Sequence, residues 1–158
     1  MKDMQKDDIV GDYDEQSQTF SDGSSRQVFI TQKETAFPAG CLIVSQTDVN
    51  GVITAANDSF ITMSGYSREE IIGSPHAILR HPDMPAAAFA DLWQTLQAGN
   101  KWYGYVKNLR KDGGFYWVYA TAIPNVRDGV VKGYTSVRRE PSKTKTEECK
   151  KLYSEMLN

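Results

Sequence analysis

Residues 80–98 read RHPDMPAAAFADLWQTLQA and join two different kinds of sequence. The first six, RHPDMP at 80–85, combine a cation, an imidazole and a carboxylate with two prolines; we call them the proline corner. Because proline fixes φ and interrupts regular structure, these polar side chains stand on a stiff connector. The residues that follow predict a helix over 86–98, with an apolar side chain at i, i+3, i+4 and i+7. Those four residues are Phe89, Leu92, Trp93 and Leu96. A stiff polar connector favours a ligand-facing loop, which gains preorganisation.

Upstream of the proline corner, the sequence predicts two short strands and two capped helices. The strands are expected over 41–47 and 52–54, joined by an Asn-Gly turn, which is the strongest short hairpin signal. Asn57 is expected to cap a first helix over 58–64, and a capping-box pattern at Ser67 begins a second.

Downstream, three β segments are expected over 102–110, 115–123 and 130–138. Glycine-rich turns too short for a crossover join them, so this part of the sheet is antiparallel. The order of strands, short helices and strands predicts an α+β fold, with one sheet carrying helices on one side.

The chain has 158 residues, which indicates one domain with tails. We expect a flexible polar leader over 1–29, because its first 25 residues are rich in Asp, Gln, Ser and Gly. The compact domain is expected over 30–140. The tail at 141–158 is rich in Lys, Thr and Glu and carries a weak helical stripe.

Composition excludes several classes of function. The net charge of −2 does not favour nucleic acid or an anionic membrane surface as a partner. No apolar run approaches the roughly 20 residues that a transmembrane helix needs. Cys41 and Cys149 follow no metal-ligand spacing, and a reduced, cytoplasmic setting is expected.

The strand at 102–110 carries a candidate binding face. Trp102, Gly104, Val106 and Asn108 share one side of it, because side chains alternate along a strand. A glycine in a strand often marks a close approach, and a carboxamide both donates and accepts hydrogen bonds. This face fits the floor of a site for a flat heteroaromatic ring, or else an ordinary core face. Trp93 on the helix is open to the same two interpretations.

Other polar residues also have two interpretations each. His76 and His81 follow no metal pattern, and a lone histidine is either a haem ligand or a hydrogen-bonding group. Arg80 either pairs with Asp83 at the surface or grips a phosphate through its planar fork. The sequence shows no paired acids, nucleophile elbow or phosphate-cradling loop, so we expect a binding module and no enzyme.

The chain resembles a PAS domain, and specifically the FAD-binding PAS domain of bacterial aerotaxis receptors. The resemblance covers roughly residues 30–140, and the proline corner followed by AFADLW is its most specific part. The other matching stretches are Thr47-Asp48, Ile53-Thr54, Ala56-Asn57, Phe60, Ser64-Gly65-Tyr66, Pro75-His76, Gly99, Trp102, Lys107-Asn108, Tyr116-Trp117-Val118, Gly133-Tyr134 and Ser136-Val137-Arg138.

The resemblance implies a PAS fold, a five-stranded antiparallel sheet with short helices covering one face, and FAD bound non-covalently between them. By resemblance, the polar residues that bind FAD are Asn57, Arg80, His81 and Asp83. Trp93 and Trp102 are then aromatic walls, Gly104 lies in the floor, and Asn108 stands beside the redox-active edge of the flavin. Reversal of that carboxamide on reduction would signal cellular redox state, and oxygen indirectly, to a partner protein through a homodimer.

The chain departs from the family at Leu109, where a second basic residue is usual, and at Gly114 and Phe115 after the turn. The membrane anchor and signalling region of aerotaxis receptors are not found in it. Three alternatives stay open: a haem-binding gas sensor, a cofactor-free PAS dimerisation module, and a LOV-type blue-light sensor. The last needs a thiol near the ring, and neither Cys41 nor Cys149 occupies the expected segment.

Overall fold

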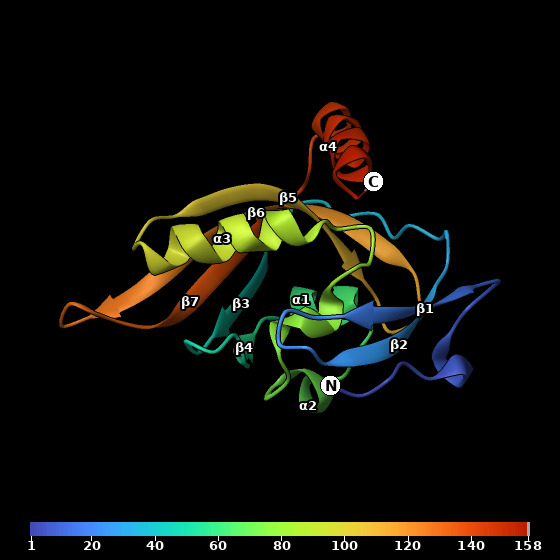
Figure 1. Cartoon of the computed structure of the whole chain (residues 1–158), viewed down its shortest axis with the longest axis horizontal. Coiled ribbons are helices and arrows are strands. Elements are labelled where there is room, and N and C mark those ends of the chain that lie inside the picture. Colours follow the sequence, from blue (N-terminus) through green and yellow to red (C-terminus); the bar gives the residue numbers. More distant parts are fainter. Residues whose placement is uncertain (158) are drawn as a thin grey trace.

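The computed structural model describes residues 1–157 and is built on one five-stranded antiparallel sheet (Figure 1). The strand order across this sheet is β4-β3-β7-β6-β5, which confirms the α+β fold with an antiparallel sheet. The strands are β3 (Ile43–Thr47), β4 (Ile53–Ala56), β5 (Trp102–Leu109), β6 (Phe115–Arg127) and β7 (Val130–Arg139).

A tight turn determines the β6–β7 hairpin of the sheet. Asp128 and Gly129 both have positive φ, at 53° and 76°, and their turn connects β6 to β7. Such turns match the right-handed twist of the two strands. Pairing continues up to this turn, between Arg127 and Val130, so β6 extends past residue 123, where the sequence pattern ended it.

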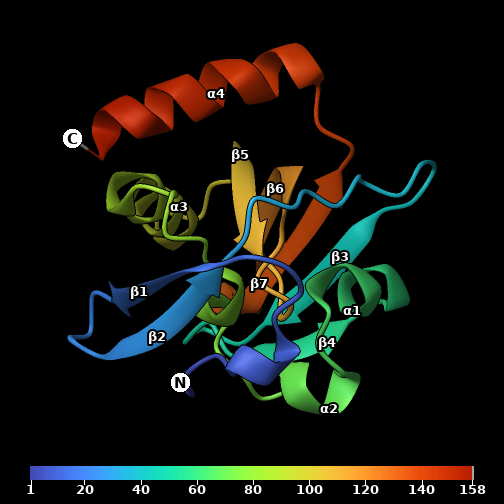
Figure 2. The ribbon, with the colours of Figure 1, turned by 90° about the vertical axis from the view of Figure 1, so that its right-hand side faces the viewer.

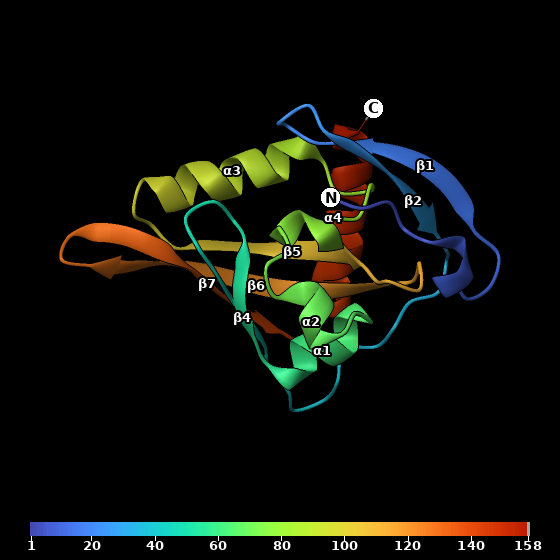
Figure 3. The same cartoon turned by 90° about the horizontal axis from the view of Figure 1, so that it is seen from below.

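Four short helices lie over one face of the sheet (Figure 3). They are α1 (Asp58–Ser64), α2 (Arg68–Ile71), the 3-10 helix η2 (His76–Leu79) and α3 (Ala86–Gln97). The Asn57 side chain caps α1, and Ser67 forms the expected capping box with Glu70 at α2. Buried apolar side chains between these helices and the sheet, including Phe60, Leu79 and Leu96, form the main core.

The N-terminal segment differs from the flexible leader expected over 1–29. It contains a 3-10 helix, η1 (Lys6–Asp8), and an antiparallel hairpin of β1 (Asp14–Thr19) and β2 (Ser25–Ile30). Val28, Phe29 and Ile30 pack with Met4 and Leu109 in a second core cluster. Long-range burial, and not local apolar density, holds this hairpin in place, so composition alone does not predict it.

The tail forms a helix, α4 (Lys143–Met156), on the other face of the sheet (Figures 1 and 2). Tyr153 stacks on Trp117 with ring centroids 6.2 Å apart and donates a hydrogen bond of 2.8 Å to the Tyr105 carbonyl. Within residues 1–157, none of the helices combines the length and apolarity that crossing a bilayer requires.

Candidate functional site

Small side chains line the middle of the sheet face that the helices cover; we call this the inner face. Ser45, Ser136 and Ala122 lie opposite one another on β3, β7 and β6. Gly104 on β5 faces Ala120 on β6 in the next row. The first row continues to Trp102 on β5 and the second to Arg138 on β7, so a floor of small side chains lies between these two large ones.

Trp102 lies on that floor. A Cβ atom at Gly104 would overlap the Trp102 indole, so this glycine makes room for the protein's own ring. The indole Nε1 donates a hydrogen bond of 2.9 Å to the Asp91 carboxylate on α3. Trp93, also on α3, is half-buried and meets the Tyr134 ring edge-on at 5.4 Å. Both tryptophans therefore stand between helix and sheet, and their role as aromatic walls of a cofactor site stays a prediction.

A buried cation lies at one end of the floor. Arg138 is 3% exposed, and its Nη2 donates to the Ser45 hydroxyl at 2.9 Å and stands 2.7 Å from Nε2 of His76. Burial lowers the pKa of Arg138 to about 10. Burial, and then the Arg138 charge, lowers the pKa of His76 to about 3, so His76 is neutral and accepts through Nε2.

Six buried side-chain nitrogen and oxygen atoms lack a hydrogen-bond partner within residues 1–157; we call them the unbonded polar atoms. Three belong to inner-face residues: Arg138 Nη1, Asn108 Nδ2 and Tyr116 Oη. Asn108 lies opposite Tyr116 in the β5–β6 register, and its carboxamide interacts with the Tyr116 hydroxyl and lowers its pKa, against the larger effect of burial. The others are Gln18 Oε1, Arg26 Nε and His81 Nε2. Because leaving such an atom without a partner costs about 1–3 kcal/mol, each of them is expected to bind a polar partner, either water or a bound molecule.

The inner-face members of this set match the chemistry of a flavin. Amide and guanidinium donors suit its carbonyl oxygens, and a hydroxyl donates to or accepts from its ring nitrogens. Tyr116 is fully buried, and burial raises the pKa of its hydroxyl to about 12, so it stays protonated. The residues present therefore fit a flat ring with polar edges.

The proline corner runs along the edge of the sheet beside β5. Arg80 bridges to Asn108 through the backbone, and Met84 Sδ accepts from the Lys107 amide at 3.4 Å. Asp83 pairs with Lys107 at 2.7 Å, and no ion pair with Arg80 forms within the described chain. Burial acts to raise the pKa of Asp83, but the hydrogen bond that it accepts from Lys107 and the nearby positive charge outweigh burial and hold this pKa below its usual value.

His81 is the buried polar residue of the corner, with 1% exposure. Its Nδ1 accepts from the Asp83 amide at 3.0 Å, so the neutral ring carries its proton on Nε2. Burial and the Lys107 charge lower the pKa of His81 to about 4, while Asp83 acts against them. His81 is therefore a neutral donor at physiological pH.

Arg80 contacts aromatic rings. Its guanidinium lies 4.5 Å from the centre of the Phe89 ring on α3 and 5.9 Å from that of Phe20 in the N-terminal hairpin. Burial lowers the pKa of Arg80, but the group stays charged. This geometry leaves its N–H donors available for an anion.

Asn57 stands apart from the other predicted residues because protein groups occupy its side chain. Its Oδ1 accepts from the amides of Phe60 and Val44, and its Nδ2 donates to the Leu42 carbonyl at 2.9 Å. These bonds tie α1 to β3, and a role for Asn57 in FAD binding stays a prediction.

Sequence reasoning missed the polar partners on the inner face and at the corner. Lys107, Ser45, Tyr116 and Arg138 were not assigned to the site, although Arg138 follows Tyr134 and Ser136 at period two on β7. That alternation places Arg138 on the buried side and was the available signal.

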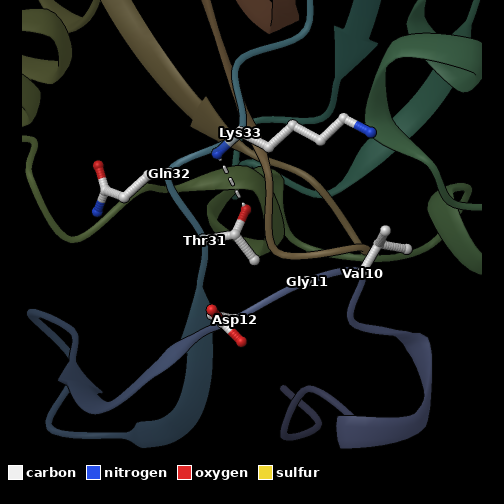
Figure 4. A pocket seen from close by; sticks show the side chains of 6 residues that line it. All are labelled: Val10, Gly11, Asp12, Thr31, Gln32 and Lys33. Atoms are coloured by element: carbon white, nitrogen blue, oxygen red, sulfur yellow. Dashed lines mark hydrogen bonds between the residues drawn. The ribbon is translucent and has the colours of Figure 1, made fainter.

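Two surface hollows lie away from this site. One lies at the open end of the N-terminal hairpin, before β1 and after β2, and is lined by residues 10–12 and 31–33 (Figure 4). The other lies at the tip of the β6–β7 hairpin, between Asn125 and Lys132. Neither contains a residue of the predicted site.

Known proteins that are similar to the chain support its resemblance to PAS domains. Residues 53–138 match the family of the PAS fold. The aerotaxis receptor of Escherichia coli (strain K12) is 45% identical over 129 residues, which are 82% of this chain and 26% of that receptor. The chain thus spans about a quarter of that relative's length.

Solved structures share the fold. The PAS domain of a Colwellia psychrerythraea protein has a TM-score of 0.59 and 26% identity, covering 65% of this chain and 87% of that one. A light-oxygen-voltage domain studied with a flavin analogue has a TM-score of 0.61 and 23% identity, covering 70% of this chain and 84% of that one.

Proposed function

The chain belongs to the PAS fold family, and from this premise we propose that it is a sensor domain that binds FAD and reports redox state. The observation that carries the proposal is the set of unbonded polar atoms on the inner face, Asn108 Nδ2, Tyr116 Oη and Arg138 Nη1. Similarity to an aerotaxis receptor supports the sensory role.

The residues of the inner face and those of the proline corner have separate roles in this proposal. The floor around Ala120 and Ala122 supports a flat ring, and Trp93 closes it on the helix side. Arg80 and His81 offer donors to the rest of the dinucleotide from the proline corner. Bound FAD would supply reversible transfer of electrons and protons at its ring.

Arg138 is suited to respond to a change in charge. It has no carboxylate within ion-pair distance in the described part of the chain, so its positive charge stabilises a neighbour that becomes more negative. Asn108 can exchange its donor and acceptor by rotating its carboxamide. Both residues thereby couple ligand charge to the hydrogen bonds of the sheet.

A contact between β5 and α4 connects the inner face to the helix on the other face of the sheet. Asn108 stands on β5, three residues from Tyr105, whose carbonyl accepts the Tyr153 hydroxyl of α4 at 2.8 Å. A change in β5 can therefore shift the population of docked and undocked α4. We propose that α4 conveys this change to a partner protein, within a homodimer, and that the chain has no catalytic role of its own.

One observation favours an alternative. The Trp102 indole already covers Gly104, as in a cofactor-free PAS dimerisation module with a self-filled core. The haem alternative is disfavoured by hydrogen bonds, because His76 accepts through Nε2 and His81 carries its proton there.

The test is equilibrium titration of the chain with FAD. Arg138→Met should weaken binding about tenfold, because it removes a buried charged donor, whereas Arg139→Met, on the exposed neighbour, should leave binding unchanged. Asn108→Ala is the second variant and should also weaken binding if Arg138→Met does not fold. Equal affinity of both variants and the wild type would contradict the proposal, and a wild type that takes up no FAD would support the cofactor-free module.

A further inference from the structure

We propose that the N-terminal hairpin is a brace that positions the proline corner for the dinucleotide part of FAD, with Gln18 and Arg26 as its positioning residues. This inference rests on the proposed function and assigns a role to a segment outside the residues matched by the PAS family, 53–138. The hairpin lies beside the segment that leads into α3 (Figure 3).

Two buried side chains of the hairpin hold backbone carbonyls of that segment. Gln18 Nε2 donates to the Arg80 carbonyl at 3.0 Å, and Arg26 Nη2 donates to the Ile78 carbonyl at 2.8 Å. Gln18 is 7% exposed and Arg26 is 3% exposed. The last carbonyls of a helix lack partners within it, so these donors fix the end of η2 where the corner begins.

The hairpin is itself anchored on the domain. Arg26 interacts with the Tyr66 hydroxyl just beyond α1, and burial raises the pKa of Tyr66 while Arg26 opposes this shift. Val28 lies in the core cluster that includes Leu109 of β5. The hairpin therefore contacts residues that precede and follow the 78–80 segment in the sequence, Tyr66 and Leu109.

The brace also touches the group that would meet a phosphate. Phe20, which directly follows β1, places its ring 5.9 Å from the Arg80 guanidinium, and Phe89 lies 4.5 Å from it. In the described chain, Arg80 makes these ring contacts and no side-chain ion pair. A planar cation fixed by aromatic rings keeps its edge donors for an anion such as a pyrophosphate.

The inference predicts selectivity between flavins. Riboflavin has the ring without phosphate, so its binding depends on the inner face and not on the corner. Loss of the brace should weaken FAD binding and leave riboflavin binding almost unchanged. A general loss of stability would weaken both ligands together.

The experiment measures the affinities of the full chain for FAD and riboflavin. Gln18→Ala should lower FAD affinity by about threefold to tenfold and change riboflavin affinity by less than about twofold. Gln16→Ala is the matched control, since Gln16 is exposed on the same strand. Phe20→Leu, which removes the ring and keeps an apolar side chain, should show the same selectivity if Gln18→Ala fails to fold.

An equal loss of affinity for both flavins in Gln18→Ala and Phe20→Leu, or no loss for either, would overturn the brace while leaving the flavin sensor intact. A wild-type chain that binds neither flavin would overturn the proposed function, and with it the brace. The two failures are therefore distinguishable.

Discussion

Acidification should destabilise this protein well above the pH at which carboxylates titrate, because both of its histidines are held neutral in the fold. Burial lowers the pKa of His76 to about 3, with a contribution from Arg138, and the pKa of His81 to about 4, with a contribution from Lys107. A histidine in the unfolded chain titrates near about 6.5. Between these values the unfolded form binds protons that the folded form excludes, so stability falls as pH falls.

The size of the effect follows from the pKa differences. A pH of about 5 lies about 1.5 pH units below the pKa of an unfolded histidine. Protonation therefore stabilises the unfolded form by up to about 2 kcal/mol per histidine. The chain has two histidines, so the free energy of unfolding should fall by up to about 4 kcal/mol between about pH 7.5 and about pH 5. Such a loss is a large part of the roughly 5–15 kcal/mol of a typical domain.

The assay is urea denaturation of the flavin-free chain at both pH values, with His76→Gln as the matched variant. Glutamine keeps an oxygen that can accept from Arg138 but does not titrate. The variant should lose about half as much stability as the wild type on acidification. If both proteins lose the same amount, His76 is not held neutral by its surroundings and the reasoning about the Arg138 pair is refuted.

Three further predictions concern individual side chains. Gly104→Ala should destabilise the chain by about 1–3 kcal/mol in urea unfolding, because its methyl group overlaps Trp102; unchanged stability would show that this indole moves freely. Asn57→Ala should cost about 2 kcal/mol in the same assay without flavin, because it removes the cap of α1 and its bonds to β3, and no cost would indicate a side chain free for a ligand. Lys107→Met should raise the pKa of His81 toward its ordinary value, followed by NMR titration of the imidazole, whereas an unmoved pKa would exclude this charge as a cause.

Local chemistry predicted most of the fold. The cap at Asn57, the capping box at Ser67 and the apolar stripe from Phe89 to Leu96 identified the helices, because each signal acts within a few residues. The far end of β6 was missed because its last residues are exposed, including Val126 at 58%, and hairpin pairing alone extends the strand.

The N-terminal hairpin escaped prediction for a different reason. Gln18 and Arg26 are polar, and composition places such residues in solvent. Their partners, the carbonyls of Arg80 and Ile78, are 62 and 52 residues away in sequence. No local pattern encodes a contact of that range, so only the folded chain reveals it.

The candidate site was partly accessible from the sequence. Strand alternation grouped Trp102, Gly104 and Asn108 on one face, and the register of β5 against β6 agrees with this grouping. Arg138 was not included because a buried arginine without a carboxylate is rare, and its contacts with His76 and Ser45 depend on tertiary packing. The packing of the Trp102 indole over Gly104 likewise depends on a side-chain conformation that alternation does not predict.

Whether the inner face holds a flavin is tested by the visible absorption spectrum of the purified chain, recorded before and after incubation with FAD. A flavin on the inner face should give a flavin spectrum that persists after unbound FAD is removed, and a released chromophore with the mass of FAD. A chain that stays colourless and retains no added FAD, while remaining folded by circular dichroism, would contradict it.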